Sequence, residues 1–373
     1  MTRKERFKAG KKLRLVIKVG SSLITTRSGR TNRPWLRKLV AQTALLRADG
    51  HQVILVSSGA IAAGMEKLGL ERRPDDIAML QSAAAVGQGI LIRRYADMFS
   101  KADVIVGQVL LTQFDTTHRQ QYLNAQAALV KMLETGVVPV VNENDTTAVD
   151  EIRFGDNDTL AALVTVLTSS DALIILSDIQ GLCTGDPRHC ATTELIDSVD
   201  EVTPEIEALV SGSVSRFGSG GMATKLAAAK IAAAAGAATV IAAGREPEIL
   251  ADIARGKNVG TFFAPAKRKL AARKIWIAYA RAPRGSIVVD EGAKRALTDR
   301  GGSLLAAGIT DVQGTFSVGD AVDVKDADGK VFARGMANYS STEIEEILGK
   351  LRQRGTAELD LDEVVHRDCL AIL

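Results

Sequence analysis

The sequence has few cysteines, few aromatic residues and no long apolar run. Its three cysteines, Cys183, Cys190 and Cys369, are odd in number, and their spacing fits neither a zinc site nor a redox pair. We therefore expect reduced thiols in a cytoplasmic protein. No apolar run approaches the length of a membrane span, so no membrane partner is expected. With 4% aromatic and 46% hydrophobic residues, the core must consist mainly of Leu, Val, Ile and Ala.

The chain also lacks a strong net charge. A formal charge of +3 over 373 residues creates no global field that would favour nucleic acid or a membrane surface. The basic segment at residues 3–14 has no apolar signal core, which favours a solvated arm over a targeting peptide. The length predicts two domains.

Short apolar runs alternate with helical patterns over residues 1–264. Runs of this kind are typical of strands buried on both faces of a parallel sheet, so the pattern predicts a three-layer α/β domain. The expected strands are residues 13–19, 53–57, 104–110, 137–141, 172–177 and 239–242. The expected helices include residues 34–48, 119–135 and 159–169. Ligands of such sheets bind at the carboxyl ends of the strands, where polar residues are the ones to examine.

The pattern changes after residue 264. Residues 265–283 carry several Lys and Arg but no acid, which indicates a basic linker. Residues 284–362 contain short alternating runs, and Asp328-Gly329 between two of them is a hairpin signal. We expect a second, small, mostly β domain here, followed by a tail at residues 363–373.

A glycine-rich turn at residues 218–225 precedes an alanine-rich helical segment. Glycine N–H groups approach a ligand closely, and a helix N-terminus favours an anion. Lys225 adds a full charge, so the turn is interpreted as a phosphate cradle. It is not a P-loop, because Leu226 stands where that motif needs Ser or Thr. The alternative is a flexible surface turn before an ordinary helix.

Two more strand ends carry polar groups beside glycine. Lys18 ends the first strand and precedes Gly20, an arrangement that suits a lysine pointing at an anion. The alternative is a solvated strand-end lysine. Ser57-Ser58-Gly59 ends the second strand, where the hydroxyls suit either helix capping or binding of a carboxylate.

Acids and amides gather at two later loops. Asn142-Glu143-Asn144-Asp145 follows the fourth strand, and Asp156-Asn157-Asp158 follows shortly after. These groups suit recognition of an amino group and of a Mg²⁺–nucleotide complex, since Mg²⁺ prefers oxygen ligands and takes few from protein. The alternative is Asx turns with a helix cap. No direct metal ligand is assigned.

The fifth strand ends in Ser177-Asp178, before a loop that suits a bound nucleotide or an ordinary surface turn. Two lysines in glycine-rich settings and a carboxylate cluster meet the needs of phosphoryl transfer. That reaction requires positioning and cationic stabilisation of the moving phosphoryl group.

These motifs resemble the glutamate 5-kinase family, a branch of the amino acid kinase superfamily with a C-terminal PUA domain. The matching segments are residues 16–22, 58–64, 142–145, 155–158 and 220–225, with residues 306–308, 314–320 and 335–340 resembling the PUA part. The resemblance implies a three-layer αβα kinase domain with a mainly parallel sheet, and ATP-dependent phosphorylation of the γ-carboxylate of L-glutamate in proline biosynthesis.

The resemblance also implies roles for individual residues. Lys18 and Lys225 would stabilise the transition state, and Asp158 would orient them. The implied glutamate-binding residues are Ser58, Asp145 and Asn157, supported by Asn142 and Asp156. The implied ATP-binding residues are Lys18, Gly20, Ser177, Asp178, Ser219, Gly220, Gly221, Met222, Ala223, Thr224 and Lys225. Mg²⁺, feedback inhibition by proline, a homo-oligomer and hand-off to glutamyl phosphate reductase are further implications.

Two alternatives stay open. A sister kinase acting on acetylglutamate, aspartate, carbamate or UMP would share the phosphate-binding lysines but not the acidic loops. An RNA-binding protein is the other alternative, because PUA domains occur in such proteins. Residues 284–349 contain seven Lys or Arg against eleven Asp or Glu, whereas nucleic-acid-binding domains are normally basic.

Overall fold

The computed structural model describes residues 1–26, 29–112, 115, 118–147, 157–185, 193–210, 221–279, 283–354 and 363–373. The chain divides into two compact units, Met1–Lys269 and Leu270–Leu373. In the first unit, the expected alternation of strands and helices is present. Its elements are α1 (Arg3–Arg6), β1 (Arg14–Val19), α2 (Ser21–Ile24), α3 (Arg33–Ala48), β2 (Gln52–Ser57), α4 (Ala60–Leu68), α5 (Ile77–Phe99), η1 (Ser100–Ala102), β3 (Val106–Leu111), α7 (Arg119–Glu134), β4 (Val138–Glu143), α8 (Asn157–Leu167), β5 (Ala172–Ser177), β6 (Ser198–Val199), α9 (Pro204–Ala208), α10 (Met222–Ala234), β7 (Ala238–Ala243), α11 (Ile249–Ala254) and β8 (Thr261–Phe263).

The eight strands form one sheet in the order β3-β4-β2-β1-β5-β7-β8-β6. Its strand pairs are parallel except β7 with β8, so the prediction of a mainly parallel sheet is confirmed. The chain builds outward from β1 in both directions, with β2 on one side and β5 on the other. This makes β1 the topological switch point, and a ligand of such a sheet sits at its carboxyl end.

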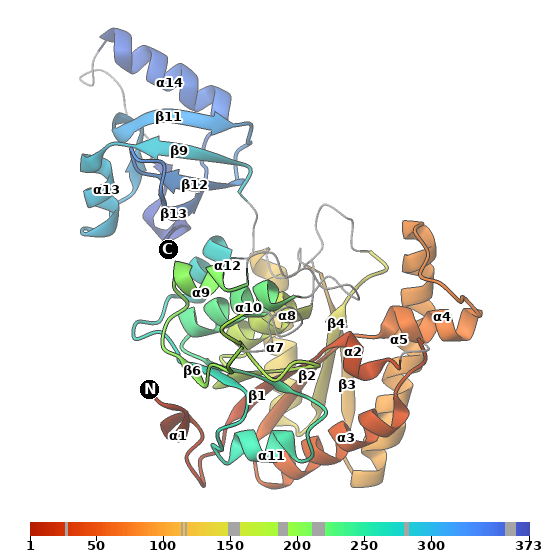
Figure 1. Ribbon diagram of the computed structural model, residues 1–373. Helices are drawn as coiled ribbons and strands as arrows, with labels where there is room; N and C mark the ends of the chain where they lie inside the picture. Colours follow the sequence, from red (N-terminus) through yellow and green to blue (C-terminus); the bar gives the residue numbers. More distant parts are fainter. Residues whose placement is uncertain are drawn as a thin grey trace. The chain divides into compact units, whose positions relative to one another are not determined.

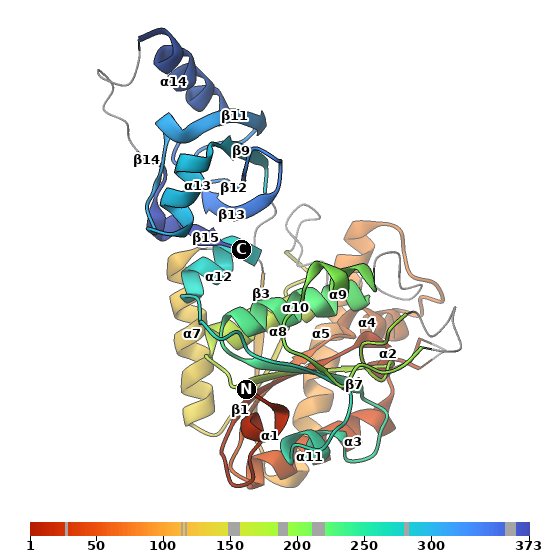
Figure 2. The ribbon, with the colours of Figure 1, turned by 60° about the vertical axis from the view of Figure 1, so that its left-hand side comes forward.

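Helices cover both faces of the sheet (Figures 1 and 2). One face packs against α3, α5 and α11 through an aliphatic core that includes Leu15, Ile17, Leu36 and Leu91. The other face is covered by α7, α8 and α10, and nearly every residue of α8 is buried. The burial of strands on both faces explains why β1, β2 and β5 have near-continuous apolar sequences.

All six strands expected in the first unit form, and each end lies within two residues of the prediction. Strands β6 and β8 were not expected. They are two and three residues long, and β8 runs against the direction of β7, so neither gives the long apolar run of a central strand.

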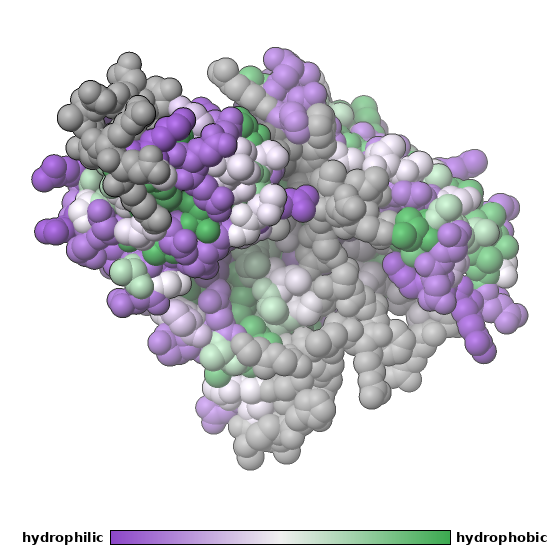
Figure 3. Space-filling model, turned by 90° about the horizontal axis from the view of Figure 1, so that it is seen from above, coloured by the Kyte–Doolittle hydropathy of each residue, from purple (hydrophilic) through white to green (hydrophobic). Residues whose placement is uncertain are grey.

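Helices α4 and α5 pack closely through glycine. A Cβ on Gly64 would lie 1.8 Å from the carbonyl oxygen of Ala83, and one on Gly87 would lie 1.8 Å from that of Ala60. Figure 3 shows hydrophobic surface at its right-hand side. On these two helices, Leu68, Ile77 and Met79 are 41–44% exposed. None of the described helices is both long and apolar enough to cross a membrane.

The second unit is mainly β, as expected. A five-stranded sheet has the order β11-β9-β12-β13-β15, and β10 pairs with β14. The predicted hairpin at Asp328-Gly329 joins β12 to β13, which pair antiparallel, and Gly329 adopts a positive φ of 79°. The elements are α12 (Ala272–Tyr279), β9 (Gly285–Val289), α13 (Glu291–Thr298), β10 (Leu304–Leu305), η3 (Ala306–Gly308), β11 (Ile309–Gly314), β12 (Ala321–Lys325), β13 (Val331–Met336), α14 (Ser341–Arg354), β14 (Glu363–Val365), η5 (Arg367–Cys369) and β15 (Leu370–Ile372).

The unit boundaries differ from the linker and tail expected at residues 265–283 and 363–373. Part of that linker is α12, whose buried Ile277 and Ala278 pack with Ala371 of β15. The expected tail supplies β14 and β15, and β15 pairs with β13. The basic composition of the linker hid an amphipathic helix, and the last strands are too short to show a periodic pattern.

Candidate active site

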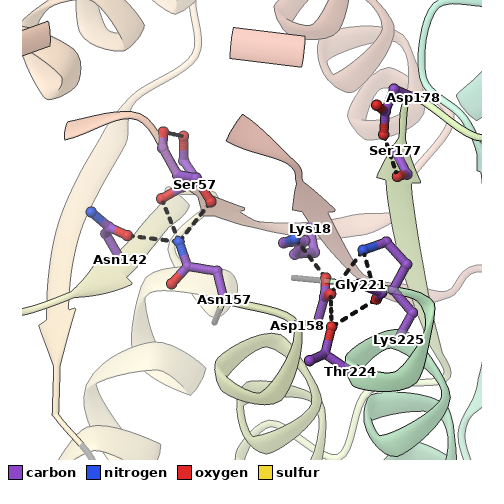
Figure 4. A network of polar contacts seen from close by, with 11 residues as sticks. Lys18, Ser57, Asn142, Asn157, Asp158, Ser177, Asp178, Gly221, Thr224 and Lys225 are labelled. Carbon is purple, nitrogen blue, oxygen red and sulfur yellow. Dashed lines mark hydrogen bonds and ion pairs between the residues drawn. The ribbon is translucent and has the colours of Figure 1, made fainter. Parts of the chain in front are cut away.

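Three charged side chains meet at the carboxyl end of the sheet in the first unit (Figure 4). Asp158, in the first turn of α8, contacts Lys18 of β1 with Oδ1 2.6 Å from Nζ. Its other oxygen, Oδ2, lies 3.1 Å from Nζ of Lys225 in α10. The exposed fraction is 5% for each lysine and 0% for Asp158. A single buried carboxylate therefore fixes both ammonium groups.

The fold explains why these residues meet. Lys18 lies near the end of β1, paired in register with Val56 of β2 and Ile175 of β5. Helices α8 and α10 pack against each other on one face of the sheet and begin at its carboxyl edge, so their first turns face Lys18. Thr224 reinforces the contact, since its hydroxyl donates to Oδ2 of Asp158 at 3.0 Å.

The cluster of Lys18, Lys225 and Asp158 carries a net positive charge. Burial raises the pKa of Asp158, but Lys18 and Lys225 lower it more, and the result is a pKa below its usual range. The carboxylate is ionised at neutral pH, which leaves a net charge of +1 on the three side chains. Lys225 also donates to the carbonyl oxygen of Gly221 at 3.3 Å. An ammonium has three donors, so N–H groups of both lysines remain for an incoming anion.

A second polar cluster begins at the neighbouring residue, Asn157. Its Nδ2 donates to Oγ of Ser58 at 2.8 Å and to Oδ1 of Asn142 at 3.0 Å. Ser58 follows β2 and precedes Gly59, whose φ of 99° favours glycine. A Cβ at Gly59 would also lie 2.8 Å from Ile24. The sheet edge thus brings together three of the predicted glutamate-binding residues.

Two polar residues of this region were missed by sequence reasoning. Gln88 and Tyr95 of α5 are 8% and 1% exposed, and Gln88 accepts from Nδ2 of Asn142 at 2.9 Å. The Tyr95 hydroxyl lies 2.9 Å from Oγ of Ser57. The available signal was a lone glutamine in a stripe of small and aliphatic residues, Ala84, Gly87 and Leu91, that faces the core.

The remaining predicted residues fall into two groups. Ser177 and Asp178 lie at the end of β5, where Oγ of Ser177 donates to Oδ1 of Asp178 at 3.1 Å. Asp145 lies just after β4, and Gly20 follows β1, with its N–H bonded to the carbonyl of Leu176 at 3.1 Å. Gly221 is the N-cap of α10, and Met222 and Ala223 begin the helix. Asp156, Ser219 and Gly220 lie outside the described residues.

The donor set fits a magnesium ion carried by a nucleotide better than a resident metal. Over the described ranges, no three His, Cys, Asp or Glu side chains gather as a metal site. Both oxygens of Asp158 already contact lysines. Mg²⁺ commonly binds nucleotide phosphates and water, with only one or two protein carboxylates, and Asp178 at the strand end could supply one.

Two cavities are lined by residues other than those of these clusters. One, of about 390 Å³, lies between α3 and α11 and is lined by residues that include Trp35, Gln42 and Arg245. The other, of about 580 Å³, lies among α3, α4 and α5 and is lined by several basic side chains, including Arg37, Lys67 and Arg93. Neither is lined by a predicted site residue, so the candidate site is defined by its polar contacts.

Comparisons with known proteins agree with this architecture. The model described as "Amino acid kinase family" matches residues 13–243, and that of the PUA domain matches residues 285–357. A glutamate 5-kinase of Myxococcus xanthus (strain DK1622) is 46% identical over 367 residues, 96% of each chain. A glutamate 5-kinase of Paraburkholderia phymatum is 48% identical over 365 residues, covering 96% of this chain and 98% of that protein.

A solved structure supports the fold alone. Carbamate kinase from Giardia lamblia bound to AMP-PNP is 16% identical, with a TM-score of 0.51, and the match covers 69% of this chain and 99% of that chain. The family match and the near full-length relatives show the family as well as the fold. The chain belongs to the glutamate 5-kinase family, with an amino acid kinase domain followed by a PUA domain.

Proposed function

We infer that this protein transfers the γ-phosphoryl group of ATP to the γ-carboxylate of L-glutamate, which forms L-glutamyl 5-phosphate in the first step of proline biosynthesis. The observation that carries this inference is the adjacency of Asn157 and Asp158 in the first turn of α8. Asn157 joins the amide and hydroxyl cluster, and Asp158 joins the two lysines. One helix turn therefore links a polar cluster suited to an amino acid to a cationic site for phosphoryl groups.

The mechanism needs no general base, because the γ-carboxylate of glutamate is already ionised at neutral pH. The difficulty is repulsion between this anion and the triphosphate. Lys18 and Lys225 reduce it, because their fixed N–H donors face the charge that spreads over the moving phosphoryl oxygens. Asp158 holds both ammonium groups in place before substrate arrives, so little reorganisation is needed during transfer.

The nucleotide is proposed to bind along the ends of β5 and α10. Ser177, Asp178 and the start of α10 at Gly221 supply hydroxyl, carboxylate and helix N-terminal groups there. Mg²⁺ bound to ATP would supply further neutralisation of phosphate charge. Residues 219 and 220 are proposed to complete the phosphate cradle, and Asp156 and Asp145 to complete the amino acid pocket.

The proposed activity is tested by its substrate range. We expect ADP release with Mg-ATP and glutamate, and none with acetylglutamate, aspartate, carbamate or UMP. Turnover of any of these in place of glutamate would contradict the proposal. The same assay with added proline tests feedback inhibition. A coupled assay with glutamyl phosphate reductase tests hand-off of the product.

Self-association and a cytoplasmic location are further proposals. The exposed apolar side chains of Leu68, Ile77 and Met79 support a homo-oligomer, since a gathered apolar patch often marks a contact surface. Size-exclusion chromatography with light scattering gives the mass directly. We expect a multiple of the 39.6 kDa chain.

A further inference from the structure

A chain of directed hydrogen bonds runs from α5 into the amide and hydroxyl cluster. Oε1 of Gln88 accepts from Nδ2 of Asn142 at 2.9 Å. Oδ1 of Asn142 then accepts from Nδ2 of Asn157 at 3.0 Å. Nδ2 of Asn157 also donates to Oγ of Ser58 at 2.8 Å. In every link, an amide nitrogen therefore faces an oxygen that can accept.

The direction of this chain is fixed at Asn157, because its Nδ2 also donates to the backbone carbonyl of Ser57 at 3.3 Å, and a carbonyl can only accept. A primary amide presents a donor on one side and an acceptor on the other, and Asn142 is only 3% exposed. If Asn142 turned over, its nitrogen would face the nitrogen of Asn157, and buried polar groups would lose their partners. Nδ2 of Asn157 therefore requires the oxygen of Asn142, and Gln88 completes the arrangement because its Oε1 accepts from the amide nitrogen on the other side of Asn142. Figure 4 shows the result, with the oxygen of Asn142 toward Asn157 and its nitrogen turned away.

The direction determines what the cluster offers a ligand. Because Nδ2 of Asn157 is committed to Asn142 and Ser58, its Oδ1 is left as an acceptor. Because Oγ of Ser58 accepts from Asn157, its O–H is left as a donor. An acceptor beside a donor matches an α-ammonium beside an α-carboxylate. In a reversed chain, Nδ2 of Asn157 would face the ligand, and this N–H donor would repel the substrate ammonium.

We propose that Gln88 is a positioning residue for the amino acid substrate. Its Oε1 holds the amide of Asn142, and Asn142 together with the carbonyl of Ser57 holds Asn157. Asn157 can then accept from the substrate ammonium, and Ser58 can donate to the substrate carboxylate. This inference rests on the proposed function, because it takes the substrate to be an amino acid. Gln88 does not touch substrate and acts through Asn142.

Two substitutions at Gln88 distinguish the effect of losing the hydrogen-bond acceptor from the effect of changing the size of the side chain. Gln88→Met keeps the length of the side chain but removes the acceptor. We expect the KM for glutamate to rise at least about ten-fold, as for the loss of one well-made buried hydrogen bond, with the kcat and the KM for Mg-ATP within about two-fold. Gln88→Glu keeps an acceptor whether or not burial leaves it protonated, so we expect its KM for glutamate to stay several-fold below that of the Met variant.

Gln126→Met is the matched control. Gln126 of α7 is part-buried and donates to the carbonyl of Leu167 at 2.7 Å, at the far end of α8 from Asn157. This variant also removes one side-chain hydrogen bond of a glutamine, which Gln126 donates whereas Gln88 accepts its own, but it does so away from the site. We expect a lower midpoint of urea unfolding and an unchanged KM for glutamate. Equal KM values for Gln88→Met and Gln88→Glu, or a matching rise in the KM for Mg-ATP, would overturn the positioning role.

A double substitution tests whether positions 88 and 142 must pair a hydrogen-bond donor with an acceptor. In Asn142→Asp, position 142 can only accept, and the Gln88 amide can turn over to donate to it while Asn157 still donates from the other side. In Gln88→Glu with Asn142→Asp, no amide donor remains between the two positions, and the two carboxyl groups repel each other unless one of them takes up a proton. We expect the KM of the double variant to exceed the product of the two single effects by at least about ten-fold. Multiplicative effects would overturn the inference, even if Gln88→Met fails to fold.

The outcomes keep the two proposals apart. No turnover of glutamate by the unsubstituted enzyme would overturn the proposed function. Turnover of glutamate by that enzyme, with the same KM in Gln88→Met, would overturn the positioning role alone.

Discussion

Lys18 and Lys225 share one buried carboxylate, Asp158, with Nζ–O distances of 2.6 Å and 3.1 Å. The lysines come from a central strand and from α10, which packs beside α8 on the same face of the sheet. Like charges would separate without the acid between them, and the acid would be costly to bury without the lysines. The three side chains therefore act as one unit, and substitutions in them are expected to be strongly coupled.

We predict that Lys18→Ala and Lys225→Ala each lower the kcat by at least about 10²-fold and change the KM for ATP far less. The reason is that fixed cationic donors act most strongly on charge that develops in the transition state. Steady-state kinetics with varied Mg-ATP measures both constants. Lys230→Ala on the same helix is the control, since Lys230 is paired with Glu207 at the surface. A change in KM alone would mean that the lysines serve ground-state binding.

Asp158→Asn is predicted to destabilise the fold as well as to reduce the activity. The substitution leaves two ammonium groups, each 5% exposed, without their counter-charge, and losing one member of a buried pair costs about 3–5 kcal/mol. Urea unfolding measures the free energy. Glu207→Gln breaks the exposed pair with Lys230 and should cost less than about 1 kcal/mol. A similar loss in both variants would contradict the role assigned to burial.

The same acid predicts a pH dependence of stability. The pKa of Asp158 in the folded state lies below its ordinary value of 3.8. Its contribution is therefore fully present above about pH 4 and is lost as the pH falls through the folded-state pKa. The unfolding free energy of the unsubstituted protein minus that of Asp158→Asn should shrink with acidification below pH 4. A constant difference between the two proteins would be inconsistent with this titration.

The strand ends and the two lysines could be predicted from the sequence, but the contacts among these residues could not. Lys18 and Lys225 stand beside glycines at a strand end and a helix start, which are local signals. Residues 142–158 hold several acids and amides, and nothing local tells which carboxylate meets the lysines. That depends on the first turn of α8, where Asp158 faces β1 and Asn157 faces β2 and β4. Gln88 was missed because its partner Asn142 lies on a distant strand.

We predict that ionisation of Tyr95 lowers the free energy of unfolding at high pH. Burial raises the pKa of Tyr95 from 10.0 to about 12, although its hydrogen bond with Ser57 lowers it. Its contribution is full below about pH 10 and is lost as the pH rises toward 12, by about 3 kcal/mol in total. Tyr95→Phe should be about 1 kcal/mol less stable at neutral pH and should lose less above pH 10. Urea unfolding from pH 8 to 11.5 compares them, and parallel curves would contradict the prediction.

Gly87 and Gly89 of α5 lie two residues apart. Alanine substitutions at these positions distinguish the effect of close helix packing from that of helix propensity. A Cβ at Gly87 would lie 1.8 Å from the carbonyl oxygen of Ala60, whereas one at Gly89 would have no heavy atom within 4 Å. Gly87→Ala should therefore force α4 from α5 and cost at least about 1–3 kcal/mol. Gly89→Ala should be neutral or stabilising by up to about 1 kcal/mol, because alanine favours a helix.

The same pair also tests whether this packing positions the site. Ala60 begins α4 two residues after Ser58, so a shift of α4 should move the Ser58 hydroxyl away from Asn157. We expect Gly87→Ala to raise the KM for glutamate and to leave the KM for Mg-ATP nearly unchanged, because Lys18 and Lys225 lie on other elements. Gly89→Ala should change neither constant. Equal kinetics in the two variants would show that the α4–α5 contact supports the fold without positioning Ser58.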